Sequence, residues 1–239
     1  MLQIISGYRR GQSCLDWLDA RHSFSFGHYH DPARMGFSDL RVLNEDCIQP
    51  GQGFARHPHQ DMEILTWVLE GQLEHRDSLG NRCRIQPGEP QLMSAGRGIQ
   101  HSEYNASPEQ PLHLLQIWIR PARQGLAPGY QQQAFPPEGR RGRLQLLASP
   151  DDTDGTLFIH QDVRIHAGAF HGSEQQQLSL AEARYTYIQV TRSALTINGQ
   201  RLAAGDAASL HNGRELTLGQ GEQAEILLFD LRPADPMVY

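Results

Sequence analysis

The sequence predicts an all-β protein built from two similar β-barrels in tandem, with few short helices. Its 23 glycines and 14 prolines divide the chain at short intervals, and between them lie short apolar runs typical of strands. Apolar patterns with the 3.6-residue period of a helix are scarce. The two halves also repeat a common order of strand, tight turn, strand and Gly-acidic turn. Short strands at such regular spacing favour a sandwich or a barrel.

The first half of the chain, residues 1–125, is expected to form the first barrel. Its best helical pattern is short and covers residues 14–21 (CLDWLDAR). The clearest strand segments are 39–44 (DLRVLN), 63–71 (EILTWVLEG) and 114–119 (LLQIWI).

The second barrel is expected over residues 146–239. The stretch 121–143 is rich in Pro, Gly, Gln and Arg and has no apolar period, so residues 126–145 are assigned as a connector. A second short helix is expected around 179–185 (SLAEARY). The predicted strands are 143–149, 185–191, 193–199, 215–219 and 225–231.

Composition limits the possible partners and compartments. A net charge of -6 and a pI near 6.0 argue against direct nucleic-acid binding, which needs a basic face. The N-terminus turns polar after five residues, and no apolar run approaches the roughly 18 residues of a membrane span, so we expect neither a signal peptide nor a membrane partner. Cys14, Cys47 and Cys83 are odd in number and lack CxxC spacing. They are expected to be buried free thiols of a cytoplasmic protein.

Several classes of chemistry are excluded by missing residues. The chain has no lysine, and all 21 basic residues are arginine. Schiff-base formation, pyridoxal-phosphate attachment and a Walker-type phosphate loop all require a lysine. No GxSxG and no GxGxxG after a strand occurs, so hydrolase and dinucleotide-binding functions have no sequence support.

Two histidine motifs with the same spacing predict a metal site. His57 and His59 flank Pro58, and His101 and Glu103 follow about 40 residues later. Residues at i and i+2 on a strand point to one face, so two neighbouring strands would bring three imidazoles and one carboxylate together. Such a set suits Fe(II), Ni(II), Cu(II), Zn(II) or Mn(II) and leaves positions open for substrate or dioxygen.

Other residues compete for these roles. Glu63 shares the parity of His57 and His59 and is the main alternative to Glu103 as carboxylate ligand. His28 and His30 have the same i, i+2 spacing but no second pair nearby, and are expected at a pocket rim or on the surface. His75 and His113 fall in strand-like segments and are expected to be core histidines, although His113 is also a candidate for the cavity wall.

The motifs resemble those of a known family. Residues 51–71 (GQGFARHPHQDMEILTWVLEG) and 93–105 (MSAGRGIQHSEYN) resemble the two signature motifs of the pirin family, which are bicupin proteins of the cupin superfamily. Residues 17–46 resemble the opening segment of that family. The general cupin pattern places a glutamate ligand at the position of Ile64, so Glu63 is displaced by one residue from that position. Pirins instead take the carboxylate from the second motif, which favours Glu103.

The resemblance implies two jelly-roll-like cupin barrels, with a metal in the first barrel alone. The ligands would be His57, His59, His101 and Glu103, and the ion would be Fe(II), with Ni, Mn, Cu and Zn as alternatives. It also implies a monomer.

The implied activity is that of a quercetin 2,3-dioxygenase, which acts on a flavonol with O2 and releases CO. Glu103 would accept the proton of the substrate 3-hydroxyl. A cavity for such a flat ring system needs apolar and aromatic walls, for which the candidates are Phe24, Phe26, Phe37, Met93 and Leu115.

Two other functions fit the same residues. One is a non-catalytic metal- or redox-sensing regulator that binds a partner protein. The other is a zinc- or nickel-containing cupin that acts on another small phenol, because barrel folds host many chemistries.

Overall fold

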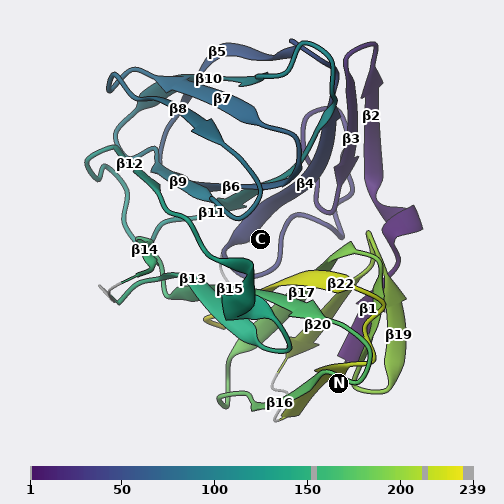
Figure 1. Ribbon diagram of the computed structural model, residues 1–239. Helices are drawn as coiled ribbons and strands as arrows, with labels where there is room; N and C mark the ends of the chain where they lie inside the picture. Colours follow the sequence, from purple (N-terminus) through teal and green to yellow (C-terminus); the bar gives the residue numbers. More distant parts are fainter. Residues whose placement is uncertain (1, 152–154, 212–214, 234–239) are drawn as a thin grey trace. The chain divides into compact units, whose positions relative to one another are not determined.

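The computed structural model describes residues 2–151, 155–211 and 215–233 (Figure 1). The chain forms two compact units. The first, called the N-terminal barrel below, comprises Arg10–Phe135 and Ile159–Gln161. The second, the C-terminal barrel, comprises residues 2–9, Pro136–Phe158 and the described residues from Asp162 onward. The predicted boundaries 1–125, 126–145 and 146–239 stay a prediction.

The N-terminal barrel contains two facing β-sheets. The seven-stranded sheet has the order β12-β9-β6-β11-β4-β3-β2, and the four-stranded sheet has the order β5-β10-β7-β8. In chain order these strands are β2 (Gly11–Leu15), β3 (Leu18–His22), β4 (Leu40–Ile48), β5 (Gly53–His59), β6 (Glu63–Glu70), β7 (Leu73–Asp77), β8 (Arg82–Ile85), β9 (Gln91–Ser94), β10 (Ile99–Asn105), β11 (Leu112–Ile119) and β12 (Gly129–Gln132).

The C-terminal barrel repeats this plan. Its sheets have the orders β1-β20-β17-β22-β15-β13-β14 and β16-β21-β18-β19. The strands are β1 (Leu2–Ile5), β13 (Leu144–Ser149), β14 (Leu157–Phe158), β15 (Val163–Phe170), β16 (Gln175–Ser179), β17 (Tyr185–Arg192), β18 (Ala194–Ile197), β19 (Gln200–Ala203), β20 (Ala207–His211), β21 (Glu215–Gly219) and β22 (Ala224–Leu231). Two short 3-10 helices, η1 (Gly7–Arg9) and η2 (Pro137–Arg140), are the only helices among the described residues. The all-β prediction of two similar barrels is confirmed.

Both predicted short helices are wrong. Residues 14–21 form most of the hairpin of β2 and β3, in which Leu18 and Ala20 are buried and Asp19 between them is exposed. This alternation is the two-residue period of a half-buried strand, and it outweighs the helical spacing of the apolar residues. Residues 179–185 join β16 to β17 through a turn. Ala183 has a φ of 65° there, which a helix does not allow.

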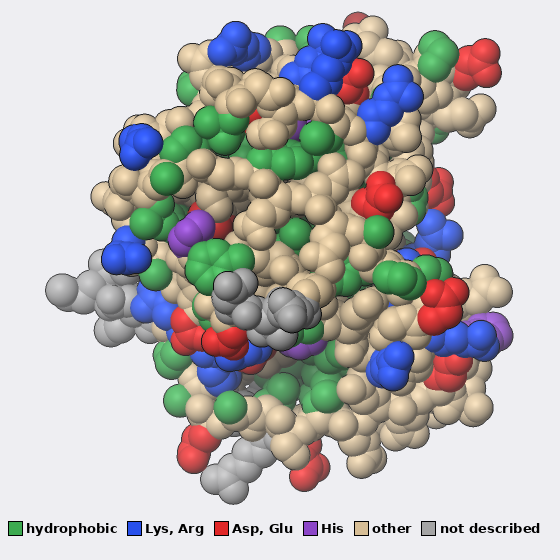
Figure 2. Space-filling view, turned by 60° about the vertical axis from the view of Figure 1, so that its left-hand side comes forward, with side chains coloured by type: hydrophobic (Ala, Val, Ile, Leu, Met, Phe, Trp, Pro, Cys, Tyr) green, Lys and Arg blue, Asp and Glu red, His purple; other side chains and the backbone are tan. Residues whose placement is uncertain are grey.

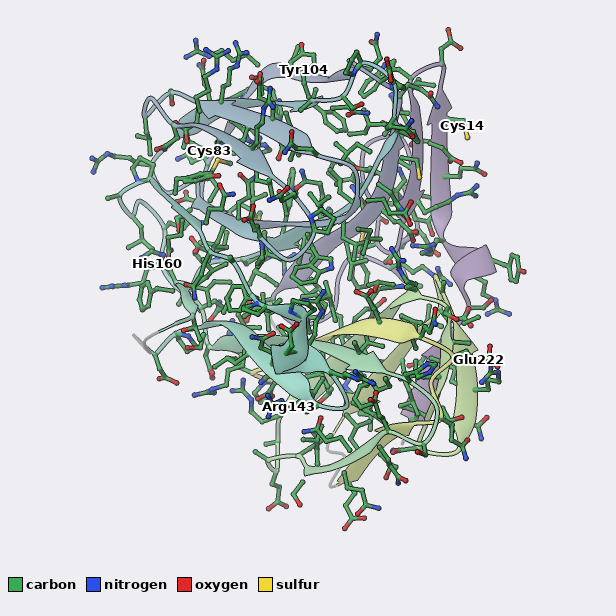
Figure 3. All side chains as sticks on the ribbon, viewed as in Figure 1. Cys14, Cys83, Tyr104, Arg143, His160 and Glu222 are labelled. Atoms are coloured by element: carbon green, nitrogen blue, oxygen red, sulfur yellow. The ribbon has the colours of Figure 1, made fainter. Side chains whose placement is uncertain are left out.

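The cysteines are free thiols, but the prediction that they are buried is wrong. Cys14 and Cys47 are exposed and Cys83 is half-buried. Cys14 lies on β2 at the edge of its sheet, and its side chain points away from the barrel (Figure 3). Short strands whose outer face meets solvent expose every second residue, whatever its polarity.

The interiors of the two barrels differ in polarity. The core of the C-terminal barrel is a cluster of 13 buried apolar residues, among them Phe170, Ile188, Leu218 and Leu228. In the N-terminal barrel, smaller apolar clusters leave a polar region in which Thr66, His101 and Glu103 are buried. Burying polar groups destabilises a fold unless they are paired, so this polar region makes the N-terminal barrel the candidate for a functional site.

The surface carries charges of both signs. On the face shown in Figure 2, arginine and acidic side chains are interspersed. Among the described residues, no helix has the length and apolar character needed to cross a membrane.

Candidate metal centre

Three of the predicted ligands come together on two neighbouring strands. His57 and His59 lie on β5 and His101 lies on β10, where it pairs directly with His57. The Nε2 atoms of His57 and His101 are 3.0 Å apart, and the ring of His59 lies 4.7 Å and 4.8 Å from the other two ring centroids. The nitrogens of all three lie within 4.8 Å of one another.

The close approach of β5 to β10 depends on a glycine. A Cβ at Gly53 would lie 2.1 Å from the carbonyl oxygen of Glu103, so no other residue fits at this position without moving one strand. A β-bulge between His101 and Glu103 shifts the register of the pair, which leaves Glu103 opposite Phe54.

The protonation of the histidines fits a metal ion. Burial, together with the neighbouring histidines, lowers the pKa of His101 to about 3 and that of His59 to about 4. His57 donates its Nδ1–H to the carbonyl oxygen of Ala55 at 2.7 Å, which leaves the Nε2 lone pair for the centre. Two imidazole nitrogens that bind one ion at about 2.1 Å and at right angles lie about 3.0 Å apart. The spacing of the nitrogens and the low pKa values of His59 and His101 therefore match a divalent transition metal.

Glu103 lies beside the three histidines in a separate set of contacts. Its Oε2 accepts a 2.6 Å hydrogen bond from Gln116, and its Oε1 accepts longer bonds from Gln91 (3.1 Å) and Thr66 (3.4 Å). The oxygens of Glu103 cluster with nitrogens of His101 and His75, not with those of His57 and His59. The structure thus places the carboxylate next to the histidine group, held by an amide and hydroxyl network from β6, β9 and β11.

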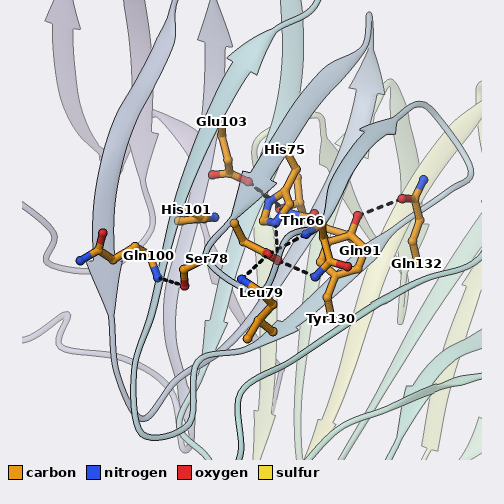
Figure 4. A network of polar contacts seen from close by, with 12 residues as sticks. Thr66, His75, Ser78, Leu79, Gln91, Gln100, His101, Glu103, Tyr130 and Gln132 are labelled. Carbon is orange, nitrogen blue, oxygen red and sulfur yellow. Dashed lines mark hydrogen bonds and ion pairs between the residues drawn. The ribbon is translucent and has the colours of Figure 1, made fainter.

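His75, which was expected to be a core histidine, is buried beside His101 and Glu103. It lies on β7 directly opposite Glu103, and its Nε2–H donates to Asp77 at 3.1 Å. Its Nδ1 has no hydrogen-bond partner among the described residues. Figure 4 shows His75, His101 and Glu103 close together, with Thr66 and Gln91 beside them. Only the pairing of β7 with β10 places His75 here, and no local motif indicates it.

Glu63 is turned away from the centre. Its Oε2 accepts hydrogen bonds from Ser94 Oγ (2.9 Å) and from the ring and backbone nitrogens of His160 (both 3.3 Å), and the neighbouring residue Ile64 lines the cavity instead. Glu63 was expected to point to the same side as His57, as it would on one continuous strand. It does not, because β5 ends at His59 and the chain turns at Asp61, which has a φ of 48°.

The other histidines lie elsewhere. His28 and His30 are exposed, in agreement with the expected rim or surface position. His113 pairs with Glu45 at 2.8 Å and is not among the residues that line the cavity.

A cavity of about 400 Å³, including its open mouth, adjoins the histidines. Of the five expected wall residues only Phe26 lines it, and Phe24, Met93 and Leu115 are buried in the core. The lining residues come from both sheets and from the loop before β4: Phe26, Asn44, Asp46, Phe54, His57, His59, Ile64, His101, Glu103, Gln116 and Trp118.

Polar groups on β4 complete the wall that faces the histidines. Asn44 Oδ1 accepts a hydrogen bond from the buried His22, whose pKa is lowered by burial. Asp46 is also buried, and its Oδ1 has no partner among the described residues. Burial, together with the negative Glu103 and Glu45, raises the pKa of Asp46 to about 7.

A chain with two double-sheet barrels, one of which gathers three histidines around a cavity, is a bicupin with a candidate metal centre. Residues 6–119 match the pirin family model, and residues 146–231 match that of the quercetinase C-terminal cupin domain. The chain belongs to the pirin family, as its motifs predicted.

Relatives with similar sequences span nearly the whole chain. It is 46% identical over 233 residues to the quercetin 2,3-dioxygenase of Escherichia coli K12, and the match covers 98% of this chain and 100% of the relative. It is 41% identical over 236 residues to a putative quercetin 2,3-dioxygenase of Pasteurella multocida, and the match covers 97% of this chain and 100% of the relative. The crystal structure of the bacterial pirin YhhW of E. coli in complex with nickel(II) has a TM-score of 0.93 at 45% identity, covering 98% of this chain and 100% of that one.

Proposed function

We propose that this protein is a metal-dependent dioxygenase of the quercetinase type, which acts on quercetin or a similar flavonol with O2 and releases CO. The observation that carries the proposal is the group of three histidines beside a carboxylate in an aromatic-lined cavity. The names of the E. coli and Pasteurella relatives support the same activity.

His57, His59 and His101 would hold the ion, with Glu103 as fourth ligand or as the nearby base. Fe(II) is the proposed ion on the family resemblance. Ni(II) is the first alternative because the E. coli relative has been crystallised with it, followed by Mn(II), Cu(II) and Zn(II). When bound, the ion would supply a Lewis acid and a template for the substrate oxygen and dioxygen.

The chain itself supplies proton transfer and positioning. Glu103 accepts the proton of the substrate hydroxyl at one of its carboxylate oxygens. Gln116, Gln91 and Thr66 donate hydrogen bonds to that carboxylate and fix its orientation before the substrate arrives.

Aromatic side chains form the walls for a flat ring system. Phe26 contacts Trp118 edge to face with ring centroids 5.4 Å apart, and Trp118 in turn contacts His59 at 4.9 Å. A ring held between such walls excludes water from the face at which it reacts.

The test is quercetin consumption and CO release by apo-protein reloaded in turn with Fe(II), Ni(II), Mn(II) and Cu(II), with His101→Ala as control. Metal-dependent turnover that is lost in the control is the expected result, and it would identify the working ion. Stoichiometric metal binding without turnover on any ion would contradict the proposal and favour the metal- or redox-sensing regulator that binds a partner protein. The cytoplasmic location and the monomeric state stay predictions.

A further inference from the structure

A second carboxyl group enters the cavity from the sheet opposite the histidines. The alternation of β4 turns Asn44 and Asp46 toward the cavity and places Glu45 on the other face. Asp46 is only 3% exposed, and its Oδ1 has no hydrogen-bond partner among the described residues. Asp46 takes no part in the mechanism proposed above.

Other carboxyl groups of the same barrel show what a structural role requires. Glu45 accepts hydrogen bonds from Arg10 (2.6 Å) and His113 (2.8 Å). Asp77 accepts bonds from the backbone nitrogens of Leu79 and Asn81 and from the side chains of Asn81 and His75. Each of these groups is satisfied by the chain itself.

Asp46 has no comparable partner among the described residues. The charged groups that act on it, Glu103 and Glu45, are both acidic, so neither offers it the cationic partner that Glu45 has in Arg10. A buried oxygen without a partner destabilises the folded state. Residues that lower stability in this way are typical of binding sites, where a ligand supplies the missing partner.

The surroundings restrict what that ligand is. Phe26, Phe54 and Trp118 line the same cavity and favour a flat aromatic ring. Asp46 belongs to neither group of clustered ligand atoms, which argues against a direct role in metal binding. A carboxyl oxygen set among aromatic walls is suited to accept a hydrogen bond from a hydroxyl group carried by that ring system.

We propose that Asp46 binds a hydroxyl group of a polyhydroxylated aromatic substrate, distinct from the hydroxyl that Glu103 deprotonates, and so selects such substrates over rings that lack it. The proposal rests on the proposed function for the aromatic nature of the substrate. It adds a specificity-determining residue on the wall opposite the metal ligands.

The experiment measures binding and not turnover. The full chain loaded with Ni(II) and kept free of dioxygen is titrated with quercetin and with 3-hydroxyflavone, which keeps only the reacting hydroxyl, and quenching of tryptophan fluorescence is followed. Asp46→Leu removes the carboxyl and keeps the branched shape and the number of heavy atoms, and Asp46→Asn keeps a hydrogen-bonding group. Asp19→Asn, a change of an exposed aspartate on β3, is the matched control.

For Asp46→Leu we expect about a 10- to 100-fold loss of affinity for quercetin and less than about a 3-fold change for 3-hydroxyflavone. Asp46→Asn should fall between Asp46→Leu and the wild type. Metal content should be unchanged in both, and the Tm of Asp46→Leu should rise by about 2–8 °C because the unpaired carboxyl is gone.

Three results would overturn the inference alone: equal losses for both flavonols, no loss for either, or loss of metal from Asp46→Leu. Absence of any flavonol binding to the wild type would overturn it together with the proposed function. Quercetin that is bound by the wild type but not consumed in the turnover assay would contradict the proposed function alone.

Discussion

The Nε2 atoms of His57 and His101 lie 3.0 Å apart, although the two residues are 44 positions apart in the sequence. The hydrogen bond from His57 Nδ1 to Ala55 leaves a lone pair on His57 Nε2. Burial keeps His101 neutral, since its pKa is lowered to about 3. A neutral His101 can donate its Nε2–H to this lone pair, which makes the contact a hydrogen bond. A metal ion that binds both nitrogens would take the place of that proton.

The first prediction concerns this pair. His101→Ala removes one nitrogen of the group and should weaken metal binding by more than about 100-fold, which exceeds the usual effect of losing a residue that only supports a ligand. Metal content after dialysis against a defined free-ion buffer measures the effect. His30→Ala is a matched control, because His30 belongs to a pair of the same spacing but is exposed. Equal metal retention in both variants would show that His101 is not a ligand.

The second prediction concerns the carboxylate and its shortest contact. Gln116 Nε2 lies 2.6 Å from Glu103 Oε2. Gln116→Leu removes this donor while keeping the volume of the side chain, so Glu103 should lose its orientation for proton transfer. We expect kcat to fall by about 10- to 100-fold with metal content unchanged.

Steady-state kinetics normalised to bound metal measure that change. Gln100→Leu is its control, because Gln100 is an exposed residue on the same strand as Glu103. A rise in KM with unchanged kcat would instead mean that Gln116 contacts substrate and does not act through Glu103.

The third prediction concerns the aromatic wall. Phe26 meets Trp118 at an interplanar angle of 87°, and both line the cavity. Phe26→Ala should raise KM for a flavonol by about 10-fold, because one face of the ring loses its contact surface, with a smaller effect on kcat. Phe26→Leu should restore part of the affinity. Unchanged KM in the alanine variant would place the substrate elsewhere.

The convergence of the candidate ligands on β5 and β10 was predictable because their geometry is local. Side chains at i and i+2 on a strand share a face, so two motifs were enough to propose that His57, His59 and His101 converge. The helix expected at 14–21 is wrong because the segment is too short to separate the helical period from the strand period. Its apolar residues fit both, and pairing with β4 favoured the strand.

The polar network around Glu103 was not predictable from the chain. Thr66, Gln91 and Gln116 lie on three different strands, and only the register of β6 with β9 and β11 brings them together. The inward position of Asp46 depends likewise on the pairing of β4 with β11. Such contacts join residues far apart in sequence, and single-sequence patterns carry no information about register between distant strands.

The last prediction is a pH dependence of stability that arises at Glu45, on the outer face of β4. Burial alone would raise the pKa of this carboxyl, but the hydrogen bond from His113 and the positive Arg10 outweigh it and lower the pKa to about 2, against an ordinary value of 4.5. Because the folded-state pKa is the lower one, the unfolded chain binds more protons between these values. The stabilisation by Glu45 is therefore fully present above about pH 4.5 and is lost as the pH falls through 2.

Glu45→Gln should lower the free energy of unfolding by about 1–3 kcal/mol at pH 7, given that the side chain is mostly buried. Near pH 3 the wild type has lost much of this contribution, so the difference between the two proteins should shrink to less than about half. Urea unfolding at both pH values measures it. A difference that stays constant from pH 7 to pH 3 would mean that the effect is one of packing, and that the charge of Glu45 does not stabilise the barrel.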